Sequence, residues 1–280
     1  MSATATVTDY QHIQVHPLTA NIGAEVHGVD LRCFDDDTFT ELHDAWMQWK
    51  VLFFRDQHLS HAEHVAFGRR FGDLEIHPFL RNVAEHPEVI VFESTAENPN
   101  AAEAWHTDVT FRERPPMGSA LRGRIIPDIG GDTLWANMEL SYERLPDKVK
   151  EDIAGRSAVH SYTKVFARDA SPSRRAEIAE EFPDVLHPIV RTHPVTGRKV
   201  LFISEPFTLR IDGVEPQQSE RILALLYEQA KKPQHQCRFR WRPDSIALWD
   251  NRCTQHYAVP DFFPRHRQME RVTIIGDRPI

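Results

Sequence analysis

Two histidines and an aspartate, far apart in the sequence, place the strongest constraint on what this chain can fold into. His106 and Asp108 are separated by a single residue, whereas His256 lies near the other end of the chain. Side chains two positions apart on an extended strand point to the same face, so His106 and Asp108 can reach one ion together. With His256 folded back beside them, two imidazoles and one carboxylate would cover one face of an octahedral metal ion, the ligand set of non-haem Fe(II) oxygenases.

The triad needs support from its surroundings, because a chain with 16 histidines contains a closely spaced His-Asp pair by chance. Residues 245–249 before His256 and 271–275 after it are mostly apolar or β-branched, which is typical of paired strands. Two arginines, Arg267 and Arg271, stand at the start of the second strand. The alternative, that the histidines are ordinary polar residues, suits either of them alone but not the whole arrangement.

Local patterns predict a mostly β fold with flanking helices. Capping residues and apolar spacing predict helices at 38–50, 60–70 and 215–231. Apolar or alternating runs predict short strands, the clearest at 51–55, 89–93, 119–125, 133–136 and 237–241. A polar, charged insertion at about 164–185 is expected to form a mobile lid over the site. No linker or repeat divides the chain, so we expect one domain over residues 1–280.

Composition argues against several classes of function. A net charge of −8 disfavours a general nucleic-acid binder, although a local group of arginines can still bind an anionic substrate. No apolar run approaches the ~20 residues of a membrane span, and the first residues lack the features of a signal peptide. Three widely spaced cysteines, Cys33, Cys237 and Cys253, suit a reducing compartment without a disulfide framework. We therefore expect a cytoplasmic protein, in which Cys253 packs rather than binds metal.

Blocks of sequence recur in a fixed order along nearly the whole chain: 22–25 with 28–31, 51–57, 71–74 with 76–78, 105–111, 130–135, 187–188 with 191–194, and 249–258. Together they resemble the TauD/TfdA family of Fe(II)- and 2-oxoglutarate-dependent dioxygenases, most closely its taurine dioxygenase branch. The resemblance implies a double-stranded β-helix, or jelly-roll, core, which fits the predicted short strands and covering helices. It also implies a homo-oligomer, a dimer or a tetramer, that acts on a small anionic organic molecule and binds neither nucleic acid nor a membrane.

The resemblance assigns a cofactor site as well. Fe(II) would be held by His106, Asp108 and His256, which leaves positions for the cosubstrate 2-oxoglutarate and for O2. Arg267 would bind the far carboxylate of 2-oxoglutarate, with the hydroxyl of Thr133 beside it. The cosubstrate would leave as succinate and CO2 while a substrate C–H bond is oxidised. Because related halogenases lack the carboxylate ligand, Asp108 indicates hydroxylation.

Further residues match the side of the pocket that binds the sulfonate in taurine dioxygenases. Arg271, His77 and the backbone of Val109 correspond to the groups around the anion. Phe166 and Phe207 correspond to the apolar walls. The alternative for Arg271 and its neighbouring arginine is a pair of surface side chains in ordinary salt bridges.

The opposite side of the pocket departs from the taurine pattern. Where taurine enzymes hold the amine, this chain has Leu80, Ala101 and Ala102, which replace hydrogen-bonding groups with aliphatic ones. A buried ammonium without acceptors costs several kcal/mol, so a zwitterionic amine should bind poorly unless Glu103 reaches it.

These observations predict an enzyme that hydroxylates a small organosulfonate, taurine or a related alkanesulfonate. Oxidation at the carbon bearing the sulfonate would release sulfite and an aldehyde. A first alternative is the same chemistry on an alkyl sulfate ester or a phenoxyalkanoate. A second alternative, from another class, is a catalytically silent jelly-roll that binds a small anion or another protein.

Overall fold

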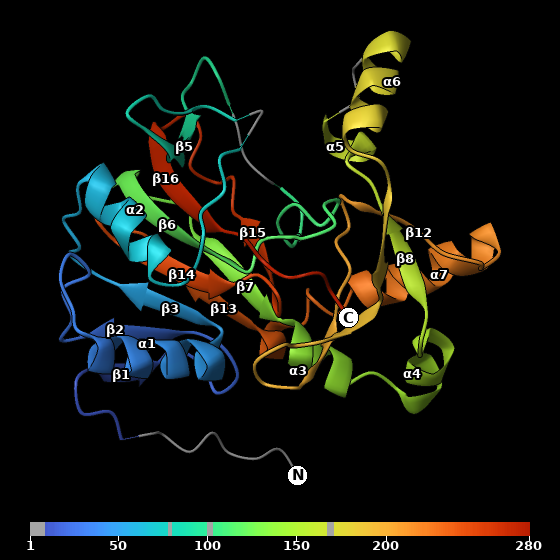
Figure 1. Cartoon of the computed structure of the whole chain (residues 1–280), viewed down its shortest axis with the longest axis horizontal. Helices are drawn as coiled ribbons and strands as arrows, with labels where there is room; N and C mark the ends of the chain where they lie inside the picture. The colour runs from blue at the N-terminus through green and yellow to red at the C-terminus, as the bar shows by residue number, and fades with distance from the viewer. Residues whose placement is uncertain (1–8, 78–79, 100–102, 167–170) are drawn as a thin grey trace.

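An eight-stranded sheet dominates one half of the computed structural model, which describes residues 9–77, 80–99, 103–166 and 171–280 (Figure 1). In spatial order the strands of this larger sheet are β1 (Gln14–Pro17), β2 (Ala24–His27), β3 (Val51–Phe54), β14 (Ile246–Asp250), β6 (Gly118–Ile125), β16 (Arg267–Ile274), β5 (His86–Ser94) and β4 (Asn82–Val83). Neighbouring strands pair antiparallel except β2 and β3, which run parallel. The order places β14 and β16, which come late in the sequence, on either side of β6.

A second, three-stranded sheet packs against the larger one. It contains β13 (Gln236–Phe239), β7 (Thr133–Asn137) and β15 (Thr254–Ala258), paired antiparallel. Phe53 of β3 stacks on Phe239 at 4.1 Å between ring centroids and meets Trp135 edge-on at 5.2 Å. These rings lie in one buried apolar cluster with Trp249, so the two sheets share a core. The predicted mostly β fold with flanking helices is confirmed.

Helices α1 (Asp36–Trp49) and α2 (His61–Arg69) cover the other face of the larger sheet. Successive residues of β3 face opposite ways, because Phe53 joins the core between the sheets whereas Leu52 and Phe54 join the core under the helices. Both helices begin at their predicted caps, an aspartate for α1 and a serine–glutamate capping box for α2. The predicted helix at 215–231 is shorter in the structure, where α7 spans Pro216–Tyr227.

The chain between β7 and β13 builds the second half of the molecule (Figure 1). It contains a three-stranded sheet of β12 (Thr208–Ile211), β8 (Ser157–His160) and β9 (Val185–Pro188), and a pair formed by β10 (Val190–Thr192) and β11 (Lys199–Leu201). Its helices, besides α7, are α3 (Met138–Glu143), α4 (Asp147–Ile153), α5 (Thr163–Phe166), α6 (Pro172–Glu181) and the short η1 (Pro233–His235). The polar insertion predicted at 164–185 contains α6, whose Ile178 packs with Tyr162 and Phe207. Its mobility stays a prediction.

The cysteines and the helices can be compared with what the sequence predicted for disulfides and membrane spans. Cys33 is exposed, Cys237 and Cys253 are buried, and all three are free. Cys253 belongs to an apolar core cluster of the second half, which agrees with the packing role expected for it. None of the helices in the described part of the chain combines the length and the apolar character needed to cross a bilayer.

Candidate metal centre and active site

The two predicted histidine ligands lie side by side because their backbones pair. His256 belongs to β15, and His106 forms an isolated antiparallel bridge with it. The His106 amide donates to the His256 carbonyl oxygen at 3.0 Å, and the His256 amide donates to the His106 carbonyl oxygen at 2.8 Å. Their ring centroids are 4.1 Å apart. Segments far apart in the sequence are thus joined at the site by backbone hydrogen bonds.

Asp108 reaches the histidine pair from a turn rather than from a strand. The sequence predicted that His106 and Asp108 share one face of a strand, but only His106 forms a bridge and residues 108–111 form a turn. Val109 in this turn has a φ of 51°, a left-handed conformation that is rare for a β-branched residue and costs about 1–3 kcal/mol. The turn still brings the groups together, since each imidazole Nε2 lies 3.9 Å from Asp108 Oδ1.

Two buried histidines that sequence reasoning had not assigned a role hold this turn. Nδ1 of His160 in β8 is hydrogen-bonded to the Thr110 hydroxyl at 2.9 Å, and His187 Nε2 in β9 donates to the Arg112 carbonyl oxygen at 2.9 Å. Burial lowers the pKa of both imidazoles, that of His160 well below its usual value, so both are neutral at pH 7. The sheet of the second half thereby supports the segment that carries the carboxylate.

The hydrogen bonds of the triad leave its ligand atoms facing one point. The ligand atoms of His106, Asp108 and His256 all lie within 4.8 Å of one another. His106 Nδ1 donates to the Ala104 carbonyl oxygen at 2.8 Å, which fixes the tautomer and leaves the Nε2 lone pair for a metal. Two nitrogens and one carboxylate oxygen in this arrangement fit a divalent transition metal with open positions.

Neighbouring charges keep the triad in the protonation state that a metal needs. Burial by itself would raise the pKa of Asp108, but the Arg271 guanidinium and then the two imidazoles lower it to about 2. Arg271 donates from one terminal nitrogen to both oxygens of Asp108, at 2.9 and 3.0 Å. Burial and the adjacent His106 lower the pKa of His256 to about 3. At neutral pH the carboxylate is therefore ionised and His256 is neutral.

Arg267 is a partly buried cation whose buried Nε is an unused donor among the described residues. Its Nε has no hydrogen-bond partner among the described residues, and burial lowers the pKa of the side chain to about 10. The guanidinium lies 5.5 Å from the Phe262 ring centroid, and a Cβ at Gly131 would come within 3.1 Å of the arginine Cδ and Nε. The Thr133 hydroxyl accepts a hydrogen bond from Trp241 Nε1 at 2.9 Å, so its own proton can be donated. These features fit a carboxylate ligand.

Two residues predicted to bind the substrate anion, His77 and Arg271, interact electrostatically with each other. His77 is buried, and burial followed by the charges of Arg271 and Arg112 lowers its pKa to about 4. The Leu80 amide donates to His77 Nδ1 at 3.2 Å, so the proton of the neutral ring is on Nε2. Arg112 pairs with Glu75 at 2.7 Å, a buried contact that sequence reasoning missed.

The predicted pocket walls are only partly described. Val109 and Phe207 lie in one apolar cluster with Phe111, Tyr162 and Ile178. Phe166 ends α5, but its side chain lies outside what the structure describes, and Ala101 and Ala102 also fall outside the described residues. Glu103, considered as a partner for an amine, is exposed.

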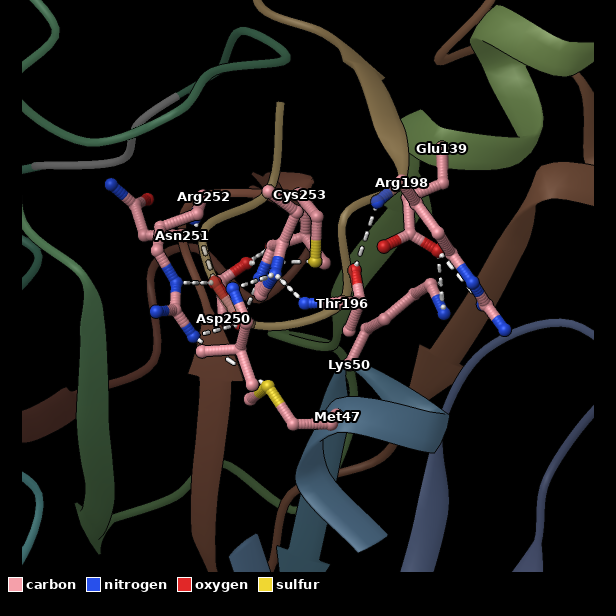
Figure 2. A network of polar contacts seen from close by, with 12 residues as sticks. Met47, Lys50, Glu139, Thr196, Arg198, Asp250, Asn251, Arg252 and Cys253 are labelled. Atoms are coloured by element: carbon pink, nitrogen blue, oxygen red, sulfur yellow. Dashed lines mark hydrogen bonds and ion pairs between the residues drawn. The ribbon is translucent and has the colours of Figure 1, made fainter. Parts of the chain in front are cut away.

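A second group of metal-binding residue types lies nearby and does not fit a metal (Figure 2). Asp250 accepts from the Arg252 backbone amide, Nε and terminal nitrogen at 2.9, 2.9 and 2.6 Å and from His193 Nε2 at 2.9 Å. His193 Nδ1 in turn accepts the Thr196 amide at 3.1 Å. Burial raises the pKa of Cys253 well above its usual value, so its thiol stays protonated. All of these groups are occupied by protein partners or protonated.

Comparison with known proteins agrees with the geometry of the first group. The model of the "Taurine catabolism dioxygenase TauD, TfdA family" matches residues 14–273. An alkylsulfatase of Acinetobacter baylyi is 37% identical over 95% of this chain and 86% of its own length. An alpha-ketoglutarate-dependent sulfate ester dioxygenase of Pseudomonas putida is 34% identical over 100% of this chain and 95% of its own. The crystal structure of a taurine dioxygenase from Burkholderia xenovorans superposes with a TM-score of 0.84 and 40% identity, covering 96% of this chain and 91% of that one. The chain belongs to the TauD/TfdA family and is an Fe(II)- and 2-oxoglutarate-dependent dioxygenase.

Proposed function

We propose that this chain is one catalytic domain with a double-stranded β-helix core, and that it hydroxylates a small organosulfonate at the carbon bearing the sulfonate. His106, Asp108 and His256 hold Fe(II). The observation that carries the proposal is the convergence of two imidazoles and an ionised carboxylate beside a buried arginine, Arg271, which bonds to that carboxylate. An anion bound there lies next to the metal site.

The protein's own share of the reaction is binding and orientation. When bound, the iron would supply, together with 2-oxoglutarate and O2, the oxidative decarboxylation to succinate and CO2 and the hydroxylation of a substrate C–H bond. Arg267 binds the far carboxylate of 2-oxoglutarate with its Nε, for which the described part of the chain offers no partner, assisted by the Thr133 hydroxyl. The apolar cluster around Val109 and Phe207 excludes water from the substrate side.

Arg271 and His77 bind the substrate anion. Arg271 uses one terminal nitrogen for Asp108, and its buried Nε has no partner among the described residues, so it can bond to the metal ligand and the anion together. Neutral His77 donates from Nε2 without adding charge. Hydroxylation at the carbon next to a sulfonate gives a hydroxysulfonate, whose C–S bond breaks to leave an aldehyde and sulfite.

An alkyl sulfate ester is a second candidate, because the relatives from Acinetobacter baylyi and Pseudomonas putida bear the names of sulfate ester enzymes. Leu80, held beside His77 by its amide, adds an aliphatic group where an amine partner would be needed for taurine. Hydroxylation at the carbon bearing the ester oxygen would give an aldehyde and sulfate. The phenoxyalkanoate alternative would require a carboxylate in place of the sulfur anion.

Product analysis on a panel of substrates tests both candidates. Purified protein with Fe(II), ascorbate and 2-oxoglutarate is supplied with taurine, pentanesulfonate, hexyl sulfate or a phenoxypropionate, and succinate, sulfite and sulfate are measured. We expect pentanesulfonate or hexyl sulfate to give a higher kcat/KM than taurine, since each methylene on an aliphatic wall contributes about 0.8 kcal/mol. Sulfite release supports the sulfonate and sulfate release the ester. If neither the sulfonates nor the sulfate ester stimulated succinate formation, the organosulfur proposal would be contradicted.

The two arginines should separate kinetically. Arg267→Ala should raise the KM for 2-oxoglutarate by roughly 30-fold or more, because a desolvated carboxylate loses its partner at a cost of about 2–5 kcal/mol. Arg271→Ala should instead impair use of the organosulfur substrate and leave slow uncoupled succinate formation. Exchanged phenotypes would show that the two roles are reversed.

Three expectations from the resemblance or the sequence stay predictions. These are a dimeric or tetrameric assembly, a cytoplasmic location, and movement of residues 164–185 as a lid. Sedimentation velocity of the purified protein addresses the assembly.

A further inference from the structure

The backbone of Asp108 is bound by a single amide side chain. Asn251 Oδ1 accepts the Asp108 amide at 3.0 Å, and its Nδ2 donates to the Asp108 carbonyl oxygen at 3.2 Å and to the Pro116 carbonyl oxygen at 3.1 Å. Asn251 is 1% exposed, so solvent does not compete for these bonds. One side chain therefore holds both backbone polar groups of a candidate metal ligand.

We call these hydrogen bonds from Asn251 to the Asp108 backbone the clamp. They satisfy the backbone amide and carbonyl of Asp108, as a neighbouring strand would in a sheet. Asp108 opens a turn and has no pairing strand, and the next residue, Val109, is in a left-handed conformation. Without an external partner, the buried amide and carbonyl of Asp108 would be unsatisfied, which is costly. The preceding residue is tied to the start of β15, because the Thr107 hydroxyl donates to the Thr254 carbonyl oxygen at 3.0 Å.

Asn251 is itself firmly anchored between the end of β14 and the start of β15, the strand that carries His256. Its backbone amide donates to the Met117 carbonyl oxygen at 2.9 Å. On either side, Asp250 and Arg252 form the buried ion pair drawn in Figure 2. The clamp thus connects the segment bearing Asp108 to the loop that leads into His256.

We propose that Asn251 is a positioning residue of the metal site, which fixes the distance between the Asp108 carboxylate and the His256 imidazole before the ion binds. The inference rests on the proposed metal site and goes beyond it by naming what holds that site together. Loss of the clamp lets the turn move, so the ion must then order it on binding. We expect Asn251→Ala to weaken metal binding by about 10- to 100-fold, the range for residues that orient metal ligands.

Gln57 provides a matched control. Its Oε1 accepts the Leu31 amide at 2.9 Å, and its Nε2 donates to the carbonyl oxygens of Val29 and Arg55 at 3.2 and 3.0 Å. Like Asn251 it accepts one backbone bond and donates two, but to three different residues, on loops that contain no candidate metal ligand. Gln57→Ala should lower the melting temperature without changing metal affinity.

The test is calorimetric titration of metal-free protein with Mn(II), without substrate or turnover. The wild type, Asn251→Ala, Gln57→Ala and His256→Ala are compared, together with their melting temperatures. Weaker Mn(II) binding in Asn251→Ala but not in Gln57→Ala supports the proposal, and equal affinity in wild type and Asn251→Ala overturns it. Failure of the wild type to bind Mn(II), or full binding by His256→Ala, would instead overturn the proposed metal site.

A measurement on the wild type keeps the inference testable if Asn251→Ala does not fold. Hydrogen exchange of the metal-free protein, resolved to the Asp108 amide, should show strong protection, because the clamp uses this amide. Exchange at the rate of an unstructured amide would show that the clamp does not exist before the metal binds, and would overturn the proposal.

Discussion

Among the described residues, two largely buried groups combine residue types that can bind a metal, and they differ in whether their ligand atoms are available. His106, Asp108 and His256 have ligand atoms within 4.8 Å of one another, as do His193, Asp250 and Cys253. Proximity is therefore the same in both, and each group contains a histidine and an aspartate, with a second histidine in the first and a cysteine in the second. The difference lies in whether the ligand atoms already accept hydrogen bonds from other protein groups.

In the first group the protein leaves ligand atoms available. His106 uses Nδ1 for a carbonyl oxygen, which frees Nε2, and Asp108 takes side-chain donors from a single nitrogen of Arg271. In the second, Asp250 takes hydrogen bonds from three groups of Arg252 and from an imidazole. A buried carboxylate satisfied in this way stabilises a fold, whereas one with a spare lone pair can bind an ion.

The largest expected effect separates the two groups by metal binding. His106→Ala, Asp108→Ala and His256→Ala should each abolish Fe(II)-dependent succinate formation, because two protein ligands do not hold the ion. His193→Ala should retain Mn(II) affinity within about threefold of wild type when the folded protein is titrated, since its imidazole is already engaged by protein groups. Full activity of Asp108→Ala, or loss of Mn(II) binding in folded His193→Ala, would remove the distinction.

The next effect concerns the stability of the fold, for which a substitution in the second group should cost more than one in the first. Asp250→Asn should lower the free energy of unfolding by about 3–5 kcal/mol, because it leaves the buried Arg252 cation without its anion. Asp108→Asn should lower it by less, because Glu75 also interacts electrostatically with Arg271 and leaves that cation with a nearby carboxyl group. Urea denaturation of the metal-free variants measures both. Equal destabilisation by the two substitutions would mean that both carboxylates are structural.

The smallest effect is on the pH dependence of stability. His256 has a pKa of about 3 in the folded protein against about 6.5 when unfolded, so between these values only the unfolded chain binds the proton. The free energy of unfolding therefore falls as the pH drops below about 6.5, by up to about 1.4 kcal/mol per pH unit. For Asp250, burial opposes ionisation, but Arg252 and His193 outweigh it and lower the pKa, so its contribution is lost only below about pH 4.

Denaturation of the metal-free protein between about pH 6.5 and pH 5 checks this difference. His256→Gln should have a flatter slope of stability against pH than the wild type, whereas Asp250→Asn should keep the wild-type slope at a lower absolute stability. A wild-type slope in His256→Gln would mean that His256 is protonated in the folded state over this range.

Structural elements that depend on residues close together in the sequence were predicted well. The helix caps depend on residues three positions apart, and the strand at 51–55 depends on apolar character over a few positions, so both are visible locally. The grouping of His106, Asp108 and His256 was also predicted. It came from the spacing of His106 and Asp108 and from the strand pattern around His256, and the resemblance to a family supported it.

Features that depend on long-range contacts were missed. Asn251 and Asp108 are 143 positions apart in the sequence, and Glu75 meets Arg112 from a different segment. Neither pair leaves a periodic pattern, because one backbone clamp or one ion pair requires only a single suitable residue at each end. The strand expected to carry both His106 and Asp108 was wrong at Asp108 for a related reason, since a turn held by distant side chains overrides local geometry.

The reciprocal backbone bonds between His106 and His256 have a consequence for how the site opens. Each residue donates its amide to the carbonyl of the other, so neither amide can be released while the other stays bound in the same geometry. The two protons should exchange with deuterium at similar rates, through one shared opening, although the residues are far apart in the sequence. The insertion and the loops between them can then vary in length without altering the spacing of the two imidazoles, since that spacing is set by a single pair of peptide groups.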